Sequence, residues 1–174
     1  GNQGYFTQGD LTAFPTMDVL VGSFERSASA ALVFTGDGFV VTYQSGLGLL
    51  RSSAVHAVAL DVDGALRGGP TMLSAMRRDA DVFGDPDPSG MAAAPGQVLV
   101  TWVEEGSPPG VRFVRLAPDG TTLQGPTAVA GLCGVPQQTT DAWSTDGAFG
   151  LVFVEDPSRG SEQLVYVPVR CAAP

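Results

Sequence analysis

The sequence predicts an all-β domain in which one sheet unit is repeated along the chain. The clearest observation is a duplicated stretch: Val55–Ser74 ("VHAVALDVDGALRGGPTMLS") and Val111–Ala130 ("VRFVRLAPDGTTLQGPTAVA") align without a gap, with eight of twenty positions identical. The 23 Gly and 13 Pro residues stand between short apolar runs, as turns stand between short strands. The chain has 21 Val and no Ile, so Val and Thr supply the β-branched side chains that favour strands.

Each copy is expected to form a strand, a tight turn and a second strand. In the later copy "VRFVRL" is the strand and "APDGT" is the turn, in which Pro118 presets φ and Gly120 adopts the left-handed conformation. "DVDG" fills the same place in the earlier copy, with Gly64 matching Gly120. After "GPT" a short outer strand is expected, "TMLS" or "TAVA".

A related strand precedes each copy. "DGFVVTYQ" (Asp37–Gln44) precedes the first and "PGQVLVTWVEE" (Pro95–Glu105) the second. A third version begins in Asp146–Cys171, where "LVYVPV" matches "VRFVRL". The alignment predicts a repeated aromatic core position, occupied by Tyr43, Trp102 and Phe153.

A repeat of about 50 residues with three or four short strands is typical of a β-propeller blade. The pattern "DGFVVTY … VHAVALDVDGALRGGPTMLS" resembles the divergent blades of bacterial secreted β-propeller proteins. That resemblance implies a propeller-like fold that serves as a binding scaffold. We expect one all-β domain over residues 14–174, with a flexible segment before it at 1–13. Within the domain we expect a closing strand at 14–24 and blade-like repeats at about 30–75, 89–130 and 140–171.

Three blades are fewer than the four to eight of a typical propeller. Either a second copy of the chain completes a six-bladed ring, or this chain is part of a larger assembly or of a longer precursor. A homo-oligomer or a place in a larger complex is therefore expected. A single β-sandwich that contains these hairpins is the alternative fold. A period of about 50 residues is uncommon in sandwiches and therefore favours the propeller.

The charge and hydropathy of the chain argue against several classes of partner. With 18 Asp and Glu against nine Arg, the net charge is −9, which repels phosphate backbones and anionic lipid headgroups. Nucleic acid is therefore not an expected partner. No apolar run approaches the roughly 20 residues that a membrane-spanning helix needs.

The two cysteines, Cys133 and Cys171, predict one disulfide, because their number is even and neither belongs to a Cys-x-x-Cys motif. Closing a loop of that length would stabilise the fold by about 4 kcal/mol on the chain-entropy model. A disulfide requires an oxidising compartment, so the protein is expected to be secreted, periplasmic or at the cell surface. A reactive thiol is the alternative, supported locally only by Arg170 beside Cys171.

The densest acidic segment, "RRDADVFGDPDPSG", is a candidate Ca²⁺ site, because clustered carboxylates suit a cation that takes six to eight oxygen ligands. Its ligands would be Asp79, Asp81, Asp85 and Asp87. A solvated connection between the first two blades is the favoured interpretation of this segment. "LDVDG" lacks the ligands that a calcium loop needs at both ends, so turn chemistry explains it.

His56, the single histidine, lies inside a predicted strand near Ser52, Ser53 and Asp61, from which a catalytic triad can be drawn on paper. No Gly-x-Ser-x-Gly motif is present, and residues of one strand rarely converge. Because Arg112 takes the same place in the second copy, His56 is expected on a tolerant, exposed face.

Aromatic and acidic residues offer candidate glycan contacts. Trp102 and Trp143 can stack on a sugar, although core packing is the favoured interpretation of both. Glu104–Glu105 and Glu155–Asp156 end equivalent strands and would place carboxylates on one rim. Glycoside cleavage would need two such groups about 5 to 9.5 Å apart.

The sequence favours an exported, non-catalytic binding or scaffold module that presents the loops of a propeller-like domain to a protein or a glycan. Two alternatives stay open. One is a structural subunit of a larger extracellular or cell-surface assembly, joined through exposed strand edges. The other is a glycan-active hydrolase that uses the rim carboxylates. No catalytic or cofactor-binding residue is assigned.

Overall fold

The computed structural model describes residues 30–47, 52–74, 87–104, 110–130, 135–145, 148–156 and 163–169. Every regular element in these ranges is a strand, which confirms the predicted all-β class. The strands are β1 (Ala30–Phe34), β2 (Gly38–Leu47), β3 (Ser52–Asp61), β4 (Thr71–Met72), β5 (Asp87–Ala94), β6 (Gln97–Glu104), β7 (Gly110–Leu116), β8 (Thr122–Ala128), β9 (Val135–Thr145), β10 (Ala148–Asp156) and β11 (Gln163–Val169).

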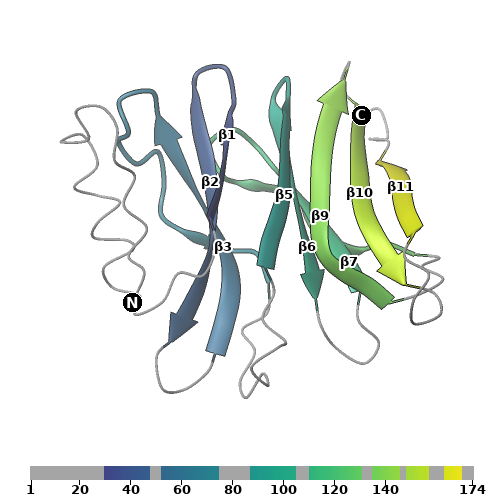
Figure 1. The fold of residues 1–174 in the computed structure, drawn as a ribbon. Coiled ribbons are helices and arrows are strands. Elements are labelled where there is room, and N and C mark those ends of the chain that lie inside the picture. Colours follow the sequence, from purple (N-terminus) through teal and green to yellow (C-terminus); the bar gives the residue numbers. More distant parts are fainter. Residues whose placement is uncertain are drawn as a thin grey trace, which may run out of the picture.

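The strands form three antiparallel sheets, and strands that follow one another in the chain are neighbours in each sheet. We call them blade 1 (β1–β4), blade 2 (β5–β8) and blade 3 (β9–β11). The first strands of the three sheets lie side by side, with β5 packed between β1 and β9 (Figure 1). Sheets that extend outward from adjacent first strands are arranged as propeller blades are, so the predicted propeller-like fold is confirmed.

The pairing register of the outer strands reproduces the sequence duplication. In blade 1 His56 pairs with Met72, and in blade 2 Arg112 pairs with Ala128, each 56 positions further along. The duplicated stretch is therefore a duplicated piece of sheet, in which equivalent positions stand opposite one another in both copies.

The predicted aromatic core position is also confirmed by the register. Tyr43, Trp102 and Phe153 occupy equivalent places in β2, β6 and β10, and their exposed fractions are 5%, 0% and 1%. Their partners on the third strands are His56, Arg112 and Val165 respectively.

The turn between the third and fourth strands has one geometry in blades 1 and 2. Gly64 (φ 82°) and Gly120 (φ 85°) both adopt the left-handed conformation, as predicted. Each donates its N–H to the carbonyl three residues earlier, that of Asp61 at 3.1 Å and that of Ala117 at 2.9 Å. Glycine is needed at these positions because a Cβ is disfavoured at positive φ.

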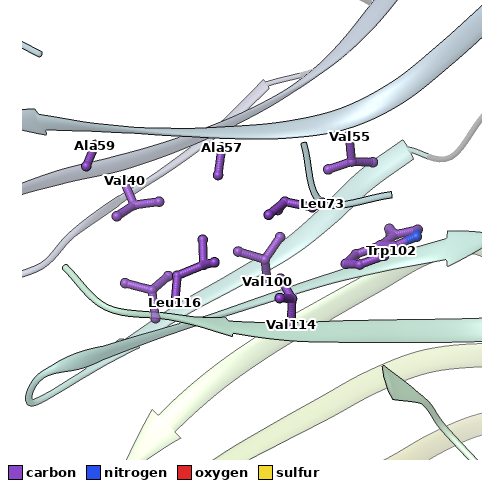
Figure 2. Close-up of a cluster of buried hydrophobic side chains, with 10 residues drawn as sticks. Val40, Val55, Ala57, Ala59, Leu73, Val100, Trp102, Val114 and Leu116 are labelled. Carbon is purple, nitrogen blue, oxygen red and sulfur yellow. The ribbon is translucent and has the colours of Figure 1, made fainter. Parts of the chain in front are cut away.

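The blades pack face to face. We call the face of a blade that carries Tyr43, Trp102 or Phe153 its leading face, and the opposite one its trailing face; residues alternate between them along a strand. The leading face of blade 2 packs on the trailing face of blade 1 in one apolar cluster (Figure 2). Its members are Val40, Val55, Ala57, Ala59 and Leu73 from blade 1, and Val98, Val100, Trp102, Val114 and Leu116 from blade 2.

The leading face of blade 3 packs on the trailing face of blade 2 in the same way. This interface contains Ala92, Leu99, Val103, Val111 and Phe113 of blade 2 and Phe149, Leu151 and Phe153 of blade 3. Two hydroxyl groups also join blades: Thr42 donates to the sulfur of Met91 at 3.1 Å, and Ser144 donates to the carbonyl of Ala93. Blade 2 is therefore covered on both faces.

The first strand of each blade is the part of the fold that the sequence analysis missed. β5 reads "DPSGMAAA" and β9 reads "VPQQTTDAWST", and neither shows the regular apolar–polar alternation of a half-buried strand. Each first strand pairs along one edge only, where Pro and small residues are tolerated. The expected flexible segment (1–13) and closing strand (14–24) lie outside the described residues.

Candidate functional site

Several strand ends of blades 2 and 3 meet at one edge of the molecule, the lower edge in Figure 1. Neighbouring strands are antiparallel, so β5 begins where β6 ends. Asp87, the first residue of β5, pairs with Val103, and Glu104 is the last residue of β6. Glu155 and Asp156 end β10 at the same edge. We call Asp87, Glu104, Glu155 and Asp156 the acidic rim.

Both blades have an irregular register at the acidic rim. The β5–β6 pairing shifts between Pro88 and Gly90, and the β9–β10 pairing shifts between Phe153 and Glu155. An irregularity of this kind bends its strand and turns nearby side chains in a new direction, which is why bulges are common beside functional sites. Two such shifts therefore mark this edge as the candidate site.

Part of this rim could be predicted from the sequence. Glu104 and Glu155 were expected at the ends of equivalent strands, and Glu104 ends β6 while Glu155 lies in the last two residues of β10. Asp87 was missed as a rim residue because the first strands were not recognised. Glu105, Cys133 and Cys171 lie outside the described residues.

The four aspartates predicted to bind calcium are only partly within the described chain. Asp79, Asp81 and Asp85 lie outside it. Asp87 is the first residue of β5. Within the ranges that the structure describes, no three His, Cys, Asp or Glu side chains gather as metal ligands.

At the opposite edge, aspartates stabilise the turns. Asp61 Oδ1 accepts the N–H groups of Asp63 at 2.9 Å and of Ala65 at 2.8 Å. Asp119 Oδ1 accepts the backbone N–H of Thr121 at 2.9 Å and its hydroxyl at 2.7 Å. The backbone hydrogen bond from Thr121 lowers the pKa of Asp119. These bonds agree with the turn interpretation of "LDVDG".

Arg67 connects two turns of blade 1. Its guanidinium forms an ion pair with the Asp37 carboxylate at 3.0 Å and also donates to the Asp37 carbonyl. The hydrogen bond from Arg67 lowers the pKa of Asp37. The same guanidinium lies close to Gly38, where a Cβ would collide with the carbonyl oxygen of Leu60. This pair could not be predicted from the sequence, because 30 residues separate its members and no local pattern relates them.

His56 stacks on Tyr43 on the leading face of blade 1, with ring centroids 5.3 Å apart and planes at 15°. The histidine is half-buried, so the expectation of an exposed face was wrong: the ring of Tyr43 covers it. Burial lowers the pKa of His56 and raises that of Tyr43. The catalytic triad considered for His56 does not form. Ser52 and Asp61 stand at opposite ends of β3, roughly 30 Å apart at about 3.3 Å per residue.

The two tryptophans lie in different settings. Trp102 is fully buried between blades 1 and 2, which confirms the core interpretation, and its indole N–H has no hydrogen-bond partner among the described residues. Trp143 lies in β9, opposite Gly150 of β10. It therefore belongs to the first strand of blade 3, next to β5.

Comparisons with known proteins identify a fold. No protein-family model and no curated protein matches the sequence. Among solved structures, the chain is similar to an alpha-L-arabinofuranosidase from Lactobacillus brevis, at 10% identity and a TM-score of 0.52, over 82% of this chain and 52% of that one. It is also similar to a thermostable family-43 glycoside hydrolase, at 10% identity and a TM-score of 0.53, over 86% of this chain and 57% of that one.

The chain thus spans a little over half the length of these two solved structures. Among the described residues there is no helix that is long and apolar enough to cross a membrane. At 10% identity the likeness concerns the fold alone. Together with three blades that extend from adjacent first strands, it shows that this chain has the fold of part of a β-propeller.

Proposed function

We propose that this domain is a non-catalytic module that binds a glycan at the acidic rim. The observation that carries the proposal is that Asp87, Glu104 and Glu155 stand at strand ends along one edge of adjacent blades, beside two register shifts. Carboxylates accept hydrogen bonds from sugar hydroxyls, and several of them at fixed positions select a pattern of hydroxyls. The likeness of the fold to two glycan-cleaving enzymes supports a glycan over other ligand classes.

Binding without cleavage is favoured because cleavage demands more of the site. It needs two carboxyl groups about 5 to 9.5 Å apart on either side of one glycosidic bond. The three described blades form a row with β5 in the middle, and the chain spans only a little over half of the similar enzymes. Such a row supports contact with one side of a sugar chain, which is sufficient for binding.

Calorimetric titration with oligosaccharides tests the proposal. The panel contains arabinose-containing, xylan, cellulose and starch fragments, and each mixture is also examined for cleavage products by chromatography. We expect binding to at least one class with no product. Glu104→Gln and Glu155→Gln should each weaken binding about 10-fold, equivalent to about 1.4 kcal/mol. Asp119→Asn, at the opposite edge, is the matched control and should leave the affinity unchanged.

The same experiment separates the alternatives. Absence of binding across the panel would contradict the proposal and favour a protein partner or a structural role in an assembly. Release of product, abolished by Glu155→Gln, would identify a hydrolase instead. Repeating the titration with added calcium and with a chelator tests the proposed ligands Asp79, Asp81, Asp85 and Asp87.

We further propose that the protein acts outside the cytoplasm with a disulfide between Cys133 and Cys171. Thiol labelling under denaturing conditions should modify neither cysteine before reduction and both after it. Labelling of both without reduction would contradict the disulfide and remove the main support for export.

A further inference from the structure

The leading face of blade 1 is the end of the row at which no described blade stands, yet its centre is buried. Within the described residues, the apolar cluster on this face comes from β2 and β3 alone. Its four most buried members are at most 5% exposed: Val41, Tyr43, Val58 and Leu60. Their equivalents in blade 2 are all 0% exposed because blade 1 covers them (Figure 2): Val100, Trp102, Val114 and Leu116. The centre of the leading face of blade 1 is thus covered almost as completely as an interface between two blades.

The trailing face of blade 3 shows how a sheet face without such a cover differs. Val152 and Val154, on its middle strand β10, are only partly buried. Leu164 and Tyr166, opposite and next to them on β11, are 74% and 51% exposed. A sheet therefore does not bury the side chains of its own face, and the centre of the leading face of blade 1 has a cover that comes from elsewhere in the chain.

This cover is narrower than a blade. Leu32 and Phe34, which β1 places on the same face, are 58% and 53% exposed. The equivalent residues of β5, Met91 and Ala93, are partly buried against blade 1. The cover of blade 1 thus extends over β2 and β3 but not over β1, which fits a single segment of chain better than a whole blade.

Residues 14–24 are the segment best suited to form this cover. Three stretches outside the described residues adjoin blade 1 in the chain: 1–29, 48–51 and 75–86. The second has only four residues, and the third has five charged residues among twelve, which are costly to bury. In contrast, 14–24 ("FPTMDVLVGSF") has one charged residue, Asp18, and six large apolar ones: Phe14, Met17, Val19, Leu20, Val21 and Phe24.

We propose that residues 14–24 pack across the two middle strands of the leading face of blade 1 and thereby end the row of blades on this side. Phe24 is six positions before Ala30, the start of β1, so it lies within about 20 Å of that strand. β2 and β3 are the next two strands of the sheet, about 5 and 10 Å further, and are within reach. Terminal segments that cover the last apolar face keep arrays of repeats soluble. With this face occupied by its own chain, a second copy cannot join a ring through blade 1.

Proton NMR titration of the whole chain tests where the segment lies. His56 is the single histidine and stacks on Tyr43 on this face, so its imidazole signal reports on the cover. Leu20→Asn and Val21→Asn are the test variants, because neighbouring residues of an extended segment point to opposite sides. One of them should loosen the cover and raise the pKa of His56 toward its ordinary value, since burial lowers that pKa in the folded protein.

Leu11→Asn, in the polar stretch before the segment, is the matched control and should leave the pKa of His56 unchanged. If neither test variant raises this pKa more than Leu11→Asn does, the proposal is overturned. Circular dichroism confirms that the variants keep the fold during the titration.

A double-mutant cycle gives a second test that does not depend on His56. Urea unfolding is measured for Leu20→Ala, Val21→Ala and Val41→Ala, singly and combined. Residues in contact are not additive, so for one of the two segment residues the loss of folding equilibrium constant in the double variant should fall short of the product of the single losses by about 3-fold or more. Leu164→Ala, on the trailing face of blade 3, is the control and should combine independently with both.

Coupling of the segment to Leu164 and not to Val41 would overturn the proposal, because the segment would then pack on blade 3. Independent effects in every combination would overturn it as well. The proposal does not depend on glycan binding, so either can fail alone.

Discussion

β7 and β11 are equivalent strands in two different settings. Both are the third strand of a blade, and "VRFVRL" in β7 matches "LVYVPV" in β11. β7 lies in the middle blade and has buried residues on both faces, whereas every residue of β11 is exposed or only partly buried. The place of a blade in the row, more than the sequence of its strands, therefore decides how much of a strand is buried.

β11 is nevertheless built for burial on both faces. Val165 and Val167 point to blade 2, and Leu164 and Tyr166 point the opposite way. A strand with one solvent-exposed face usually alternates apolar and polar residues, while a strand covered on both faces is apolar throughout. Among the side chains of β11 that point away from blade 2, only Pro168 suits the position of β11 at the edge of its sheet. Proline has no backbone N–H to donate to a further strand.

The largest effect is expected in the middle blade. Trp102→Ala removes an indole that is fully buried between blades 1 and 2 and should lower the free energy of unfolding by about 3–5 kcal/mol. Trp102→Phe places there the residue type of the equivalent Phe153 and should cost less than about 1.5 kcal/mol. Urea unfolding followed by circular dichroism measures both. Equal losses of unfolding free energy in the two variants would contradict the packing role of this side chain.

A smaller effect is expected where the turn of blade 2 approaches blade 1. Gly120→Ala and Gly96→Ala should each cost about 1–2 kcal/mol, because both glycines have positive φ. A Cβ at Gly120 would also lie 3.4 Å from the Cβ of Ala59 in blade 1, whereas one at Gly96 would meet nothing within 4 Å. The excess loss for Gly120→Ala, measured by urea unfolding, reports how closely the two blades approach. A larger loss at Gly96 would contradict this packing.

The smallest effect concerns His56 on the leading face of blade 1. Burial lowers its pKa, so the unfolded chain takes up this proton more readily than the folded one. The folded state therefore keeps its full stability above the unfolded pKa of about 6.5 and loses stability as the pH falls from there through the lower pKa of the folded state. His56→Val, the residue type of the equivalent Val165, should reduce the pH dependence of the free energy of unfolding between pH 7.5 and 5. An unchanged pH dependence would contradict the burial.

The repeat could be predicted from the sequence because its signals are local. The Asp-Gly turns ending in Gly64 and Gly120 and the apolar third strands lie within short stretches, and the structure has them where expected. The first strands could not be found, because β5 and β9 are specified by pairing and by contact with other blades and not by an apolar pattern of their own.

The candidate site was predictable only in part for the same reason. Glu104 and Glu155 follow recognisable strands, so their common edge could be predicted from the repeat. Asp87 and the two register shifts depend on the first strands, which left no local signal. The exposure of His56 was misjudged because an aligned arginine does not show what packs on the ring in blade 1.

A matched pair of substitutions tests most directly whether the place of a blade decides burial. Phe113→Ala and Tyr166→Ala truncate equivalent aromatic rings. Phe113 is covered by blade 3, whereas Tyr166 is 51% exposed on the trailing face of blade 3. Urea unfolding gives the free energy of unfolding of both variants. Phe113→Ala should cost about 3 kcal/mol or more and Tyr166→Ala less than about 1 kcal/mol. Equal costs would contradict the row of three blades with one open face.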